Sequence, residues 1–217
     1  MRANIFLKDV SAASRAALDA CVVQRRFAPG ESLFGQGDAP SEFFVNEEGR
    51  VKVWRATKEG VAITLTLLGP GAPLGTLGAA QNDPHNATAT ALAPVAATAW
   101  GIAAVRRIMA TDPAVAAAIL RIVTSYAEQM IQRLEEVSTV PIEQRLARTL
   151  LRQRAALGGD DRLELSRQDL ADLTSSTLPT VSRIMSRWRR ARWIAGTRGH
   201  VEILEAVRLA EVGESGG

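Results

Sequence analysis

The hydrophobic pattern of the first hundred or so residues changes over short distances, as in β-structure. Val51-Lys52-Val53-Trp54 alternates apolar and polar positions, which is typical of a half-buried strand. Similar short apolar segments, separated by Gly, Pro, Asn and Asp, predict further strands at 27–34, 42–45, 62–68, 87–92 and 96–100. Many short strands between closely spaced turns favour a jelly roll or a similar barrel.

From Pro113 the apolar period lengthens to three or four residues, which predicts a long helix. Its apolar positions are Val115, Ile119, Ile122, Tyr126, Met130, Leu134 and Val137. This spacing is close to that of a two-stranded coiled coil, and one barrel would not cover roughly 33 Å of helix. We therefore expect a homodimer, whose interface includes Ile119, Ile122, Tyr126, Met130 and Val137. The alternative is a helix that packs only on its own barrel.

A hinge is predicted at Pro141, because proline disfavours helical geometry at the residue before it. Residues 142–157 then form another amphipathic helix, which ends at Gly158-Gly159. Two short helices around a tight turn follow between residues 165 and 193. Ser166 and Asp169 resemble a capping box at the start of the first of them. Thr177 can cap the second, and Pro179 is tolerated in its first turn.

The second short helix separates apolar from polar residues. Its buried face is predicted to hold Val181, Ile184, Met185 and Trp188, and its other face shows Thr180, Ser182, Arg183 and Arg187. Residues 194–203 place two glycines between short apolar runs and predict a β-hairpin. A helix-turn-helix followed by a hairpin is a winged helix, and a helix with this polar face suits a DNA major groove.

The charge distribution supports this interpretation. Residues 1–137 carry 13 Lys+Arg and 13 Asp+Glu, whereas residues 138–217 carry 13 and 10, so the whole net charge of +3 lies in the second segment. Between Leu173 and Val201 there is no acidic residue. The same stretch holds six arginines: Arg183, Arg187, Arg189, Arg190, Arg192 and Arg198. Such a surface is expected to bind phosphates, with an affinity that falls steeply with salt.

Several function classes are disfavoured by the composition. The single cysteine, Cys21, excludes an intrachain disulfide and a four-cysteine iron–sulfur cluster. A cupin-like metalloenzyme needs two or three histidines, and residues 1–137 contain one. Because no nucleophile triad, Walker loop or dinucleotide fingerprint is present either, we expect no catalytic residue and no enzyme. Without an 18-residue apolar run or a signal-peptide pattern, we expect a cytoplasmic protein with no membrane partner.

The order of barrel, long helix, hinge and winged helix resembles the CRP/FNR family of bacterial transcription regulators over residues 5–205. The resemblance rests on these segments: Leu33-Phe34-Gly35-Gln36-Gly37-Asp38, Gly49-Arg50-Val51-Lys52-Val53, Leu68-Gly69-Pro70-Gly71, Arg145-Leu146-Ala147-Arg148-Thr149-Leu150-Leu151 and Thr180-Val181-Ser182-Arg183. It implies an α+β protein. A cyclic-nucleotide-binding-like jelly-roll sensor domain would occupy residues 1–112, a dimerisation helix and hinge residues 113–140, and a winged helix-turn-helix DNA-binding domain residues 141–217.

The resemblance also implies a function. A homodimer would bind a palindromic double-stranded DNA site and contact RNA polymerase. Arg183 matches the arginine that reads guanine, whereas Pro179 stands where most members have a glutamate that contacts cytosine. The predicted DNA-binding residues are Ser166, Arg167, Thr177, Pro179, Thr180, Ser182, Arg183, Arg187 and Arg189.

The sensor site departs from the members that bind cyclic AMP. In those members a Gly-Glu pair and an Arg-Ser pair hold the phosphate, whereas this chain has Gly75-Thr76 and His85-Asn86, or Asn86-Ala87 with a shift of one residue. Neither pair supplies a permanent positive charge, so cyclic AMP is not the expected effector. The predicted effector pocket consists of Gly75, Thr76, Leu77, His85, Asn86, Met130 and Ile131.

The effector itself is left open by the sequence. Residues 177–183 are similar to the nitric-oxide-responsive, denitrification-regulator branch of the family, which implies a haem cofactor with His85 as its candidate iron ligand. A regulator without a bound ligand, controlled by its own abundance, is one alternative. Another is a cyclic-nucleotide-binding regulatory module for a partner protein, which would leave the winged helix unexplained.

Overall fold

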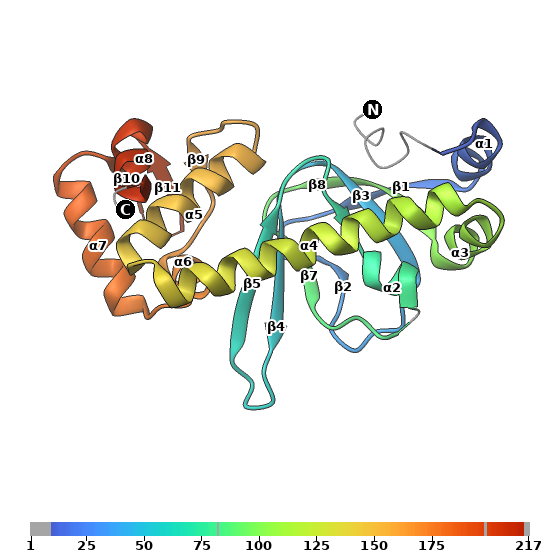
Figure 1. Ribbon diagram of the computed structural model, residues 1–217, viewed down its shortest axis with the longest axis horizontal. Helices are drawn as coiled ribbons and strands as arrows, with labels where there is room; N and C mark the ends of the chain where they lie inside the picture. The colour runs from blue at the N-terminus through green and yellow to red at the C-terminus, as the bar shows by residue number, and fades with distance from the viewer. Residues whose placement is uncertain (1–9, 82, 198, 215–217) are drawn as a thin grey trace. The chain divides into compact units, whose positions relative to one another are not determined.

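The computed structural model describes residues 10–81, 83–197 and 199–214 (Figure 1). Contacts between residues divide the chain into two compact units. One consists of Met1–Ala62 and Leu67–Gln129, and the other of Ile63–Thr66 and Met130–Gly217.

Two antiparallel sheets form the sandwich of the N-terminal domain. One has the strand order β1-β8-β3-β6 and the other β2-β7-β4-β5. The strands are β1 (Val22–Phe27), β2 (Ser32–Phe34), β3 (Glu42–Glu48), β4 (Val51–Ala56), β5 (Ala62–Leu68), β6 (Pro73–Leu74), β7 (Thr88–Ala91) and β8 (Val95–Gly101). Strands β7 and β8 occupy inner positions of their sheets, and the buried Ala89, Ala97 and Ala99 pack around Phe44 and Val51. The predicted jelly roll is therefore confirmed, with alanine-rich strands at its centre.

The single strand expected over residues 27–34 was wrong. A turn interrupts it at residues 28–31, where the Glu31 N–H donates to the Ala28 carbonyl (3.0 Å) and Gly30 has φ of +86°. The Glu31 carboxylate also accepts from the Ala28 N–H (2.9 Å). The segment therefore belongs to β1 of one sheet and β2 of the other, because the turn carries the chain between the two layers.

Three helices that the sequence analysis did not predict pack on the sandwich: α1 (Ala12–Ala20), α2 (Thr76–Gln81) and α3 (Ile102–Thr111). The long helix α4 (Pro113–Thr139) begins where it was expected. A core cluster joins these helices to the sandwich through Leu18, Phe43, Trp100, Ile102 and Ile119, together with Val115. The Trp100 indole N–H donates to the Leu18 carbonyl (3.1 Å), which fixes α1 on strand β8.

The C-terminal domain has the predicted winged-helix order. It comprises α5 (Ile142–Ala156), β9 (Arg162–Leu163), α6 (Arg167–Leu173), α7 (Leu178–Arg190), β10 (Ile194–Gly196), β11 (Val201–Ile203) and α8 (Ala206–Glu214). Both bonds of the capping box between Ser166 and Asp169 are present. Ser175, in the turn between α6 and α7, has a φ of +50°. Strands β10 and β11 form the expected hairpin, which β9 extends to three strands (Figure 1).

Candidate functional site

Helix α7 is held in the domain by its apolar face. Val181, Ile184, Met185 and Trp188 are buried, and Trp188 is only 1% exposed. The Thr177 hydroxyl accepts from the Thr180 N–H (3.4 Å) at the N-terminus of the helix. Pro179 lies in the first turn, where its missing N–H removes no helical bond. On the other side of the helix, Arg183, Arg187 and Arg189 are exposed.

The predicted DNA-binding residues of α7 differ in how available they are. Pro179, Arg183 and Arg189 are exposed, and Ser182 is half-buried. Arg183 and Arg189 make no hydrogen bond or ion pair with the described residues. Arg198, the last arginine of the acid-free segment, lies outside the described residues. Two guanidinium groups on α7 are thus free to contact DNA in the unbound protein.

The hydroxyl groups at the start of the two helices are already engaged. The Thr177 and Thr180 hydroxyls bond each other (2.9 Å), and the Ser166 hydroxyl donates to Asp169 (2.5 Å). Leu178, which the sequence analysis did not single out, is 42% exposed beside Pro179. The first turn of α7 therefore presents mainly apolar groups.

Arg167, at the start of α6, differs from the other predicted DNA contacts. Its Nε is buried without a hydrogen-bond partner.

Glu143, in the first turn of α5, contacts α7 and was not predicted as a site residue. Its Oε1 accepts from the Trp188 indole N–H (2.9 Å), and its Oε2 forms an ion pair with Nη2 of Arg187. No local pattern signals this contact, because it joins residues more than forty positions apart. Arg187 is therefore engaged within the protein, unlike Arg183.

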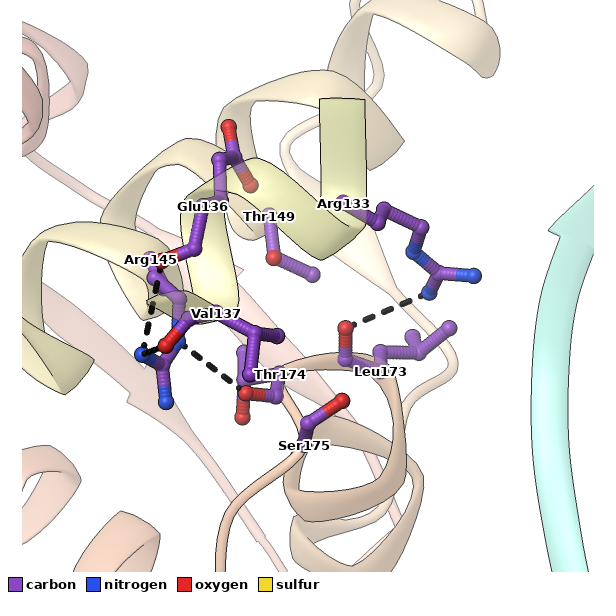
Figure 2. A pocket seen from close by; sticks show the side chains of 8 residues that line it. All are labelled: Arg133, Glu136, Val137, Arg145, Thr149, Leu173, Thr174 and Ser175. Atoms are coloured by element: carbon purple, nitrogen blue, oxygen red, sulfur yellow. Dashed lines mark hydrogen bonds between the residues drawn. The ribbon is translucent and has the colours of Figure 1, made fainter. Parts of the chain in front are cut away.

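The hinge region contains a small pocket closed by arginines (Figure 2). It is lined by Arg133, Glu136, Val137, Arg145, Thr149, Leu173, Thr174 and Ser175. Nη1 of Arg145 donates to the carbonyls of Val137 (3.1 Å) and Val140 (2.8 Å), and its Nε donates to that of Thr174 (3.2 Å). Arg145 thus caps the carboxyl ends of both α4 and α6, where a cation is favoured by the helix dipoles.

Arg133 makes a parallel contact, since its Nη2 donates to the Leu173 carbonyl (3.2 Å). Burial lowers the pKa of Arg133, and the nearby Arg152 lowers it further, against the opposing effect of Glu136. The predicted hinge at Pro141 is a real helix break, since α4 ends at Thr139 and Pro141 precedes α5. Arg133 and Arg145 link the residues on either side of it.

The apolar positions of α4 form two stripes rather than the single predicted seam. Ile119 is 1% exposed within the core of the N-terminal domain, so its assignment to a dimer interface was wrong. Ile122 and Tyr126 are half-buried on the same side, and the Tyr126 hydroxyl donates to the Pro73 carbonyl (2.8 Å). Burial raises the pKa of Tyr126 to about 12. Ile119, Ile122 and Tyr126 therefore form the stripe of α4 that covers the sandwich.

The second stripe of α4 is exposed. Leu120 is 61% exposed, Met130 48%, Leu134 68% and Val137 39%. With the half-buried Val123 and the exposed Ala127, these residues repeat at intervals of three and four positions. Among the described residues, α4 is the one helix that is long and apolar enough to cross a membrane, with a mean hydropathy of 1.2. Length and composition alone are weak evidence of a membrane span. Its first half packs instead on the sandwich.

The predicted sensor residues divide between the two units. Thr76 and His85 are buried in the N-terminal unit, near Gly75, whereas Met130 and Ile131 belong to the other unit and are exposed. Oγ1 of Thr76 is buried without a hydrogen-bond partner. Gly75 has φ of +76°, and a Cβ there would lie 2.9 Å from the Glu42 carbonyl oxygen, so this position needs glycine.

His85 is fixed in place by its neighbours. Its ring stacks on Phe34 with 4.0 Å between centroids, and its backbone bonds Gly37 (2.7 Å) and Asp38 (2.9 Å). Burial lowers the pKa of His85, against a smaller opposing effect of the Asp38 charge. Among the described residues, no group of three or more His, Cys, Asp or Glu side chains is arranged so that it could hold a metal ion.

Two family models match the chain. One, described as "Cyclic nucleotide-binding domain", matches residues 24–112, and the other, "Crp-like helix-turn-helix domain", matches residues 144–212. Together they cover both functional units in the order that the structure shows. The chain belongs to the CRP/FNR family of transcription regulators.

Relatives of similar length support this assignment. The chain is 26% identical over 215 residues to the "CRP-like cAMP-activated global transcriptional regulator" of Mycobacterium tuberculosis, covering 96% of each protein. It is 25% identical to "Nitrogen fixation regulation protein FixK" of Bradyrhizobium diazoefficiens, covering 84% of this chain and 78% of that protein. A crp/fnr-family regulator of Eubacterium rectale shares the fold, with a TM-score of 0.79, 16% identity and coverage of 99% and 100%. This CRP/FNR protein is therefore a DNA-binding transcription regulator.

Proposed function

We propose that this CRP/FNR regulator acts as a homodimer joined along the exposed stripe of α4. The observation that carries the proposal is the set of exposed residues Leu120, Met130, Leu134 and Val137. They recur on one helix with the alternating three- and four-residue spacing of a coiled coil. Four large apolar side chains left in water along a single stripe are expected to be covered by a second copy, since the stripe is self-complementary about a two-fold axis.

Two copies related in this way present two α7 helices. The proposed DNA site is therefore a palindrome whose half-sites are about 34 Å apart, one turn of the double helix. Arg183 and Arg189 supply free cations for guanine and phosphate, respectively. A bound dimer would act on transcription through contact with RNA polymerase.

The proposed effector is a largely apolar molecule other than cyclic AMP. Residues 71–100, which include α2 and the start of β7, contain no Lys or Arg to neutralise a cyclic phosphate. The M. tuberculosis relative is named as cAMP-activated, so the sensor chemistry is expected to differ between the two proteins. The buried Oγ1 of Thr76 has no partner, and a ligand carbonyl or hydroxyl would supply one.

Two other possibilities receive less support. A haem would have to reach a ring nitrogen of His85, which is only 8% exposed. A regulator without any ligand would leave only water to bond Oγ1 of Thr76.

The homodimer and its DNA site are tested by selection from random duplexes followed by footprinting and ultracentrifugation. The proposal requires a dimer protecting a palindrome, and a monomer protecting one asymmetric half-site would contradict it.

The effector is tested by calorimetry with cyclic AMP and by haem titration of anaerobic protein. We expect cyclic AMP to bind more weakly than about 1 mM, since its phosphate would be desolvated without a partner charge. Micromolar binding would refute the argument from the sensor site. If haem bound with a shifted Soret band and His85→Ala abolished that shift, haem would be the effector in place of the proposed apolar molecule.

A further inference from the structure

Arg187 is the arginine of α7 that a carboxylate restrains. Its Nη2 is paired with Oε2 of Glu143, while Oε1 of the same carboxylate accepts from the Trp188 indole N–H (2.9 Å). The Arg187 side chain is 58% exposed and that of Glu143 is 33% exposed. Trp188 is buried, so one oxygen of Glu143 is anchored to the core of the domain while the other faces the guanidinium.

The position of Arg187 makes this restraint relevant to DNA. Arg187 follows Arg183 by four residues and lies one helical turn further along α7. The segment from Leu173 to Val201 has no acidic residue of its own, so the counter-charge for α7 is brought by another helix, α5. An unpaired arginine at this exposed position would offer its charge to a phosphate whatever the base sequence.

We infer that Glu143 determines specificity by holding Arg187 away from the phosphate backbone, so that sequence-independent binding is limited. The inference rests on the proposed DNA-facing surface of α7. Partly exposed ion pairs contribute only about 0–1 kcal/mol, so removing the pair is expected to change affinity by several-fold at most. Each phosphate that a protein cation neutralises changes the slope of log K against log salt by about 0.9. The restraint therefore has a measurable signature.

The test uses the full chain and the variants Glu143→Gln, Arg187→Gln and the double variant. Glutamine at position 143 keeps an oxygen for the Trp188 N–H and removes only the charge. Glu211→Gln is the control, because it removes one acidic charge from an ion pair on α8. Binding to a random-sequence duplex and to the selected palindrome is measured by fluorescence anisotropy over a range of KCl concentrations.

We expect Glu143→Gln to bind the random duplex several-fold more tightly, with a salt slope steeper by about 0.9 per protomer that contacts DNA. The ratio of specific to random affinity should fall. The double variant should return to the wild-type slope, because the gain requires Arg187. Arg187→Gln alone and Glu211→Gln should leave the slope close to that of wild type.

Two results would overturn the inference. One is an unchanged or shallower salt slope in Glu143→Gln. The other is a slope that is shallower by about 0.9 per bound protomer in Arg187→Gln, which would show that Arg187 contacts phosphate despite Glu143. The second result decides the matter even if Glu143→Gln disturbs α7, which tryptophan fluorescence would reveal. Failure of the proposed DNA surface itself is distinguished by Arg183→Ala, which would then leave binding to the palindrome intact.

Discussion

Leu134→Ala tests the proposed dimer seam most directly. The side chain is 68% exposed on α4, so its truncation removes little from the fold of a single chain. Fully burying a leucine contributes about 1.5–3 kcal/mol, and about two thirds of this is still available to a partner. Both copies lose it, so the dimer is expected to be weakened by about 2–4 kcal/mol. This corresponds to about 30- to 1,000-fold in the dimer dissociation constant.

Sedimentation equilibrium over a concentration series measures this dissociation constant. Val207→Ala is the matched control, because Val207 is 69% exposed on α8, outside the stripe. The thermal midpoint of the dissociated protein should be the same for both variants. A dissociation constant that Leu134→Ala leaves unchanged, or that Val207→Ala raises equally, would refute the assignment of the seam.

The remaining predictions concern the DNA surface and the sensor. Arg183→Ala is expected to cost about 1–3 kcal/mol and to relax the preference at one G·C pair. Arg189→Ala should weaken all duplexes alike and reduce the salt slope by about 0.9 per bound protomer, so identical specificity profiles for the two variants would contradict the division of roles. Pro179→Glu should create a preference for cytosine at one base step, because a carboxylate accepts from cytosine N4, and selection from random duplexes would show it. Burial lowers the pKa of His85 below its ordinary 6.5, so the unfolded chain takes up the proton first and stability should fall as the pH drops below about 6.5. Urea midpoints at neutral and acidic pH should show this loss in wild type and a smaller one in His85→Phe, and an equal loss in both would exclude His85 as its source.

The winged helix was predictable from the sequence because its signals are local. The capping box of Ser166 and Asp169 spans four residues, and the wing turn spans a few more. Thr177 and Pro179 mark the start of α7 for the same reason. The capping side chains bond backbone atoms within one turn of the same helix, so these helix starts can be predicted without knowing any tertiary contact.

The strand between residues 27 and 34 shows what a local pattern leaves undecided. Its apolar residues suit a strand throughout, but the turn closed by Glu31 sends β1 and β2 into different sheets. The short helices α1, α2 and α3 escaped prediction because each is only a few turns long and depends on the sandwich for its buried face.

The period of α4 established a long helix, and tertiary packing decided which of its apolar residues are free. Ile119 and Leu120 are adjacent in sequence, yet one is 1% exposed and the other 61%. Hydrophobicity alone does not distinguish a side chain that covers its own domain from one available to a partner.

The contacts of Glu143 also depend on tertiary structure, because its carboxylate meets Arg187 and Trp188 only where α5 packs against α7. The sequence by itself determined the long helix α4, the helices α5 to α7 of the winged helix, and which of them carries the positive charge. Only the tertiary structure decided which of those charges are free, because ion pairs and burial depend on residues far apart along the chain.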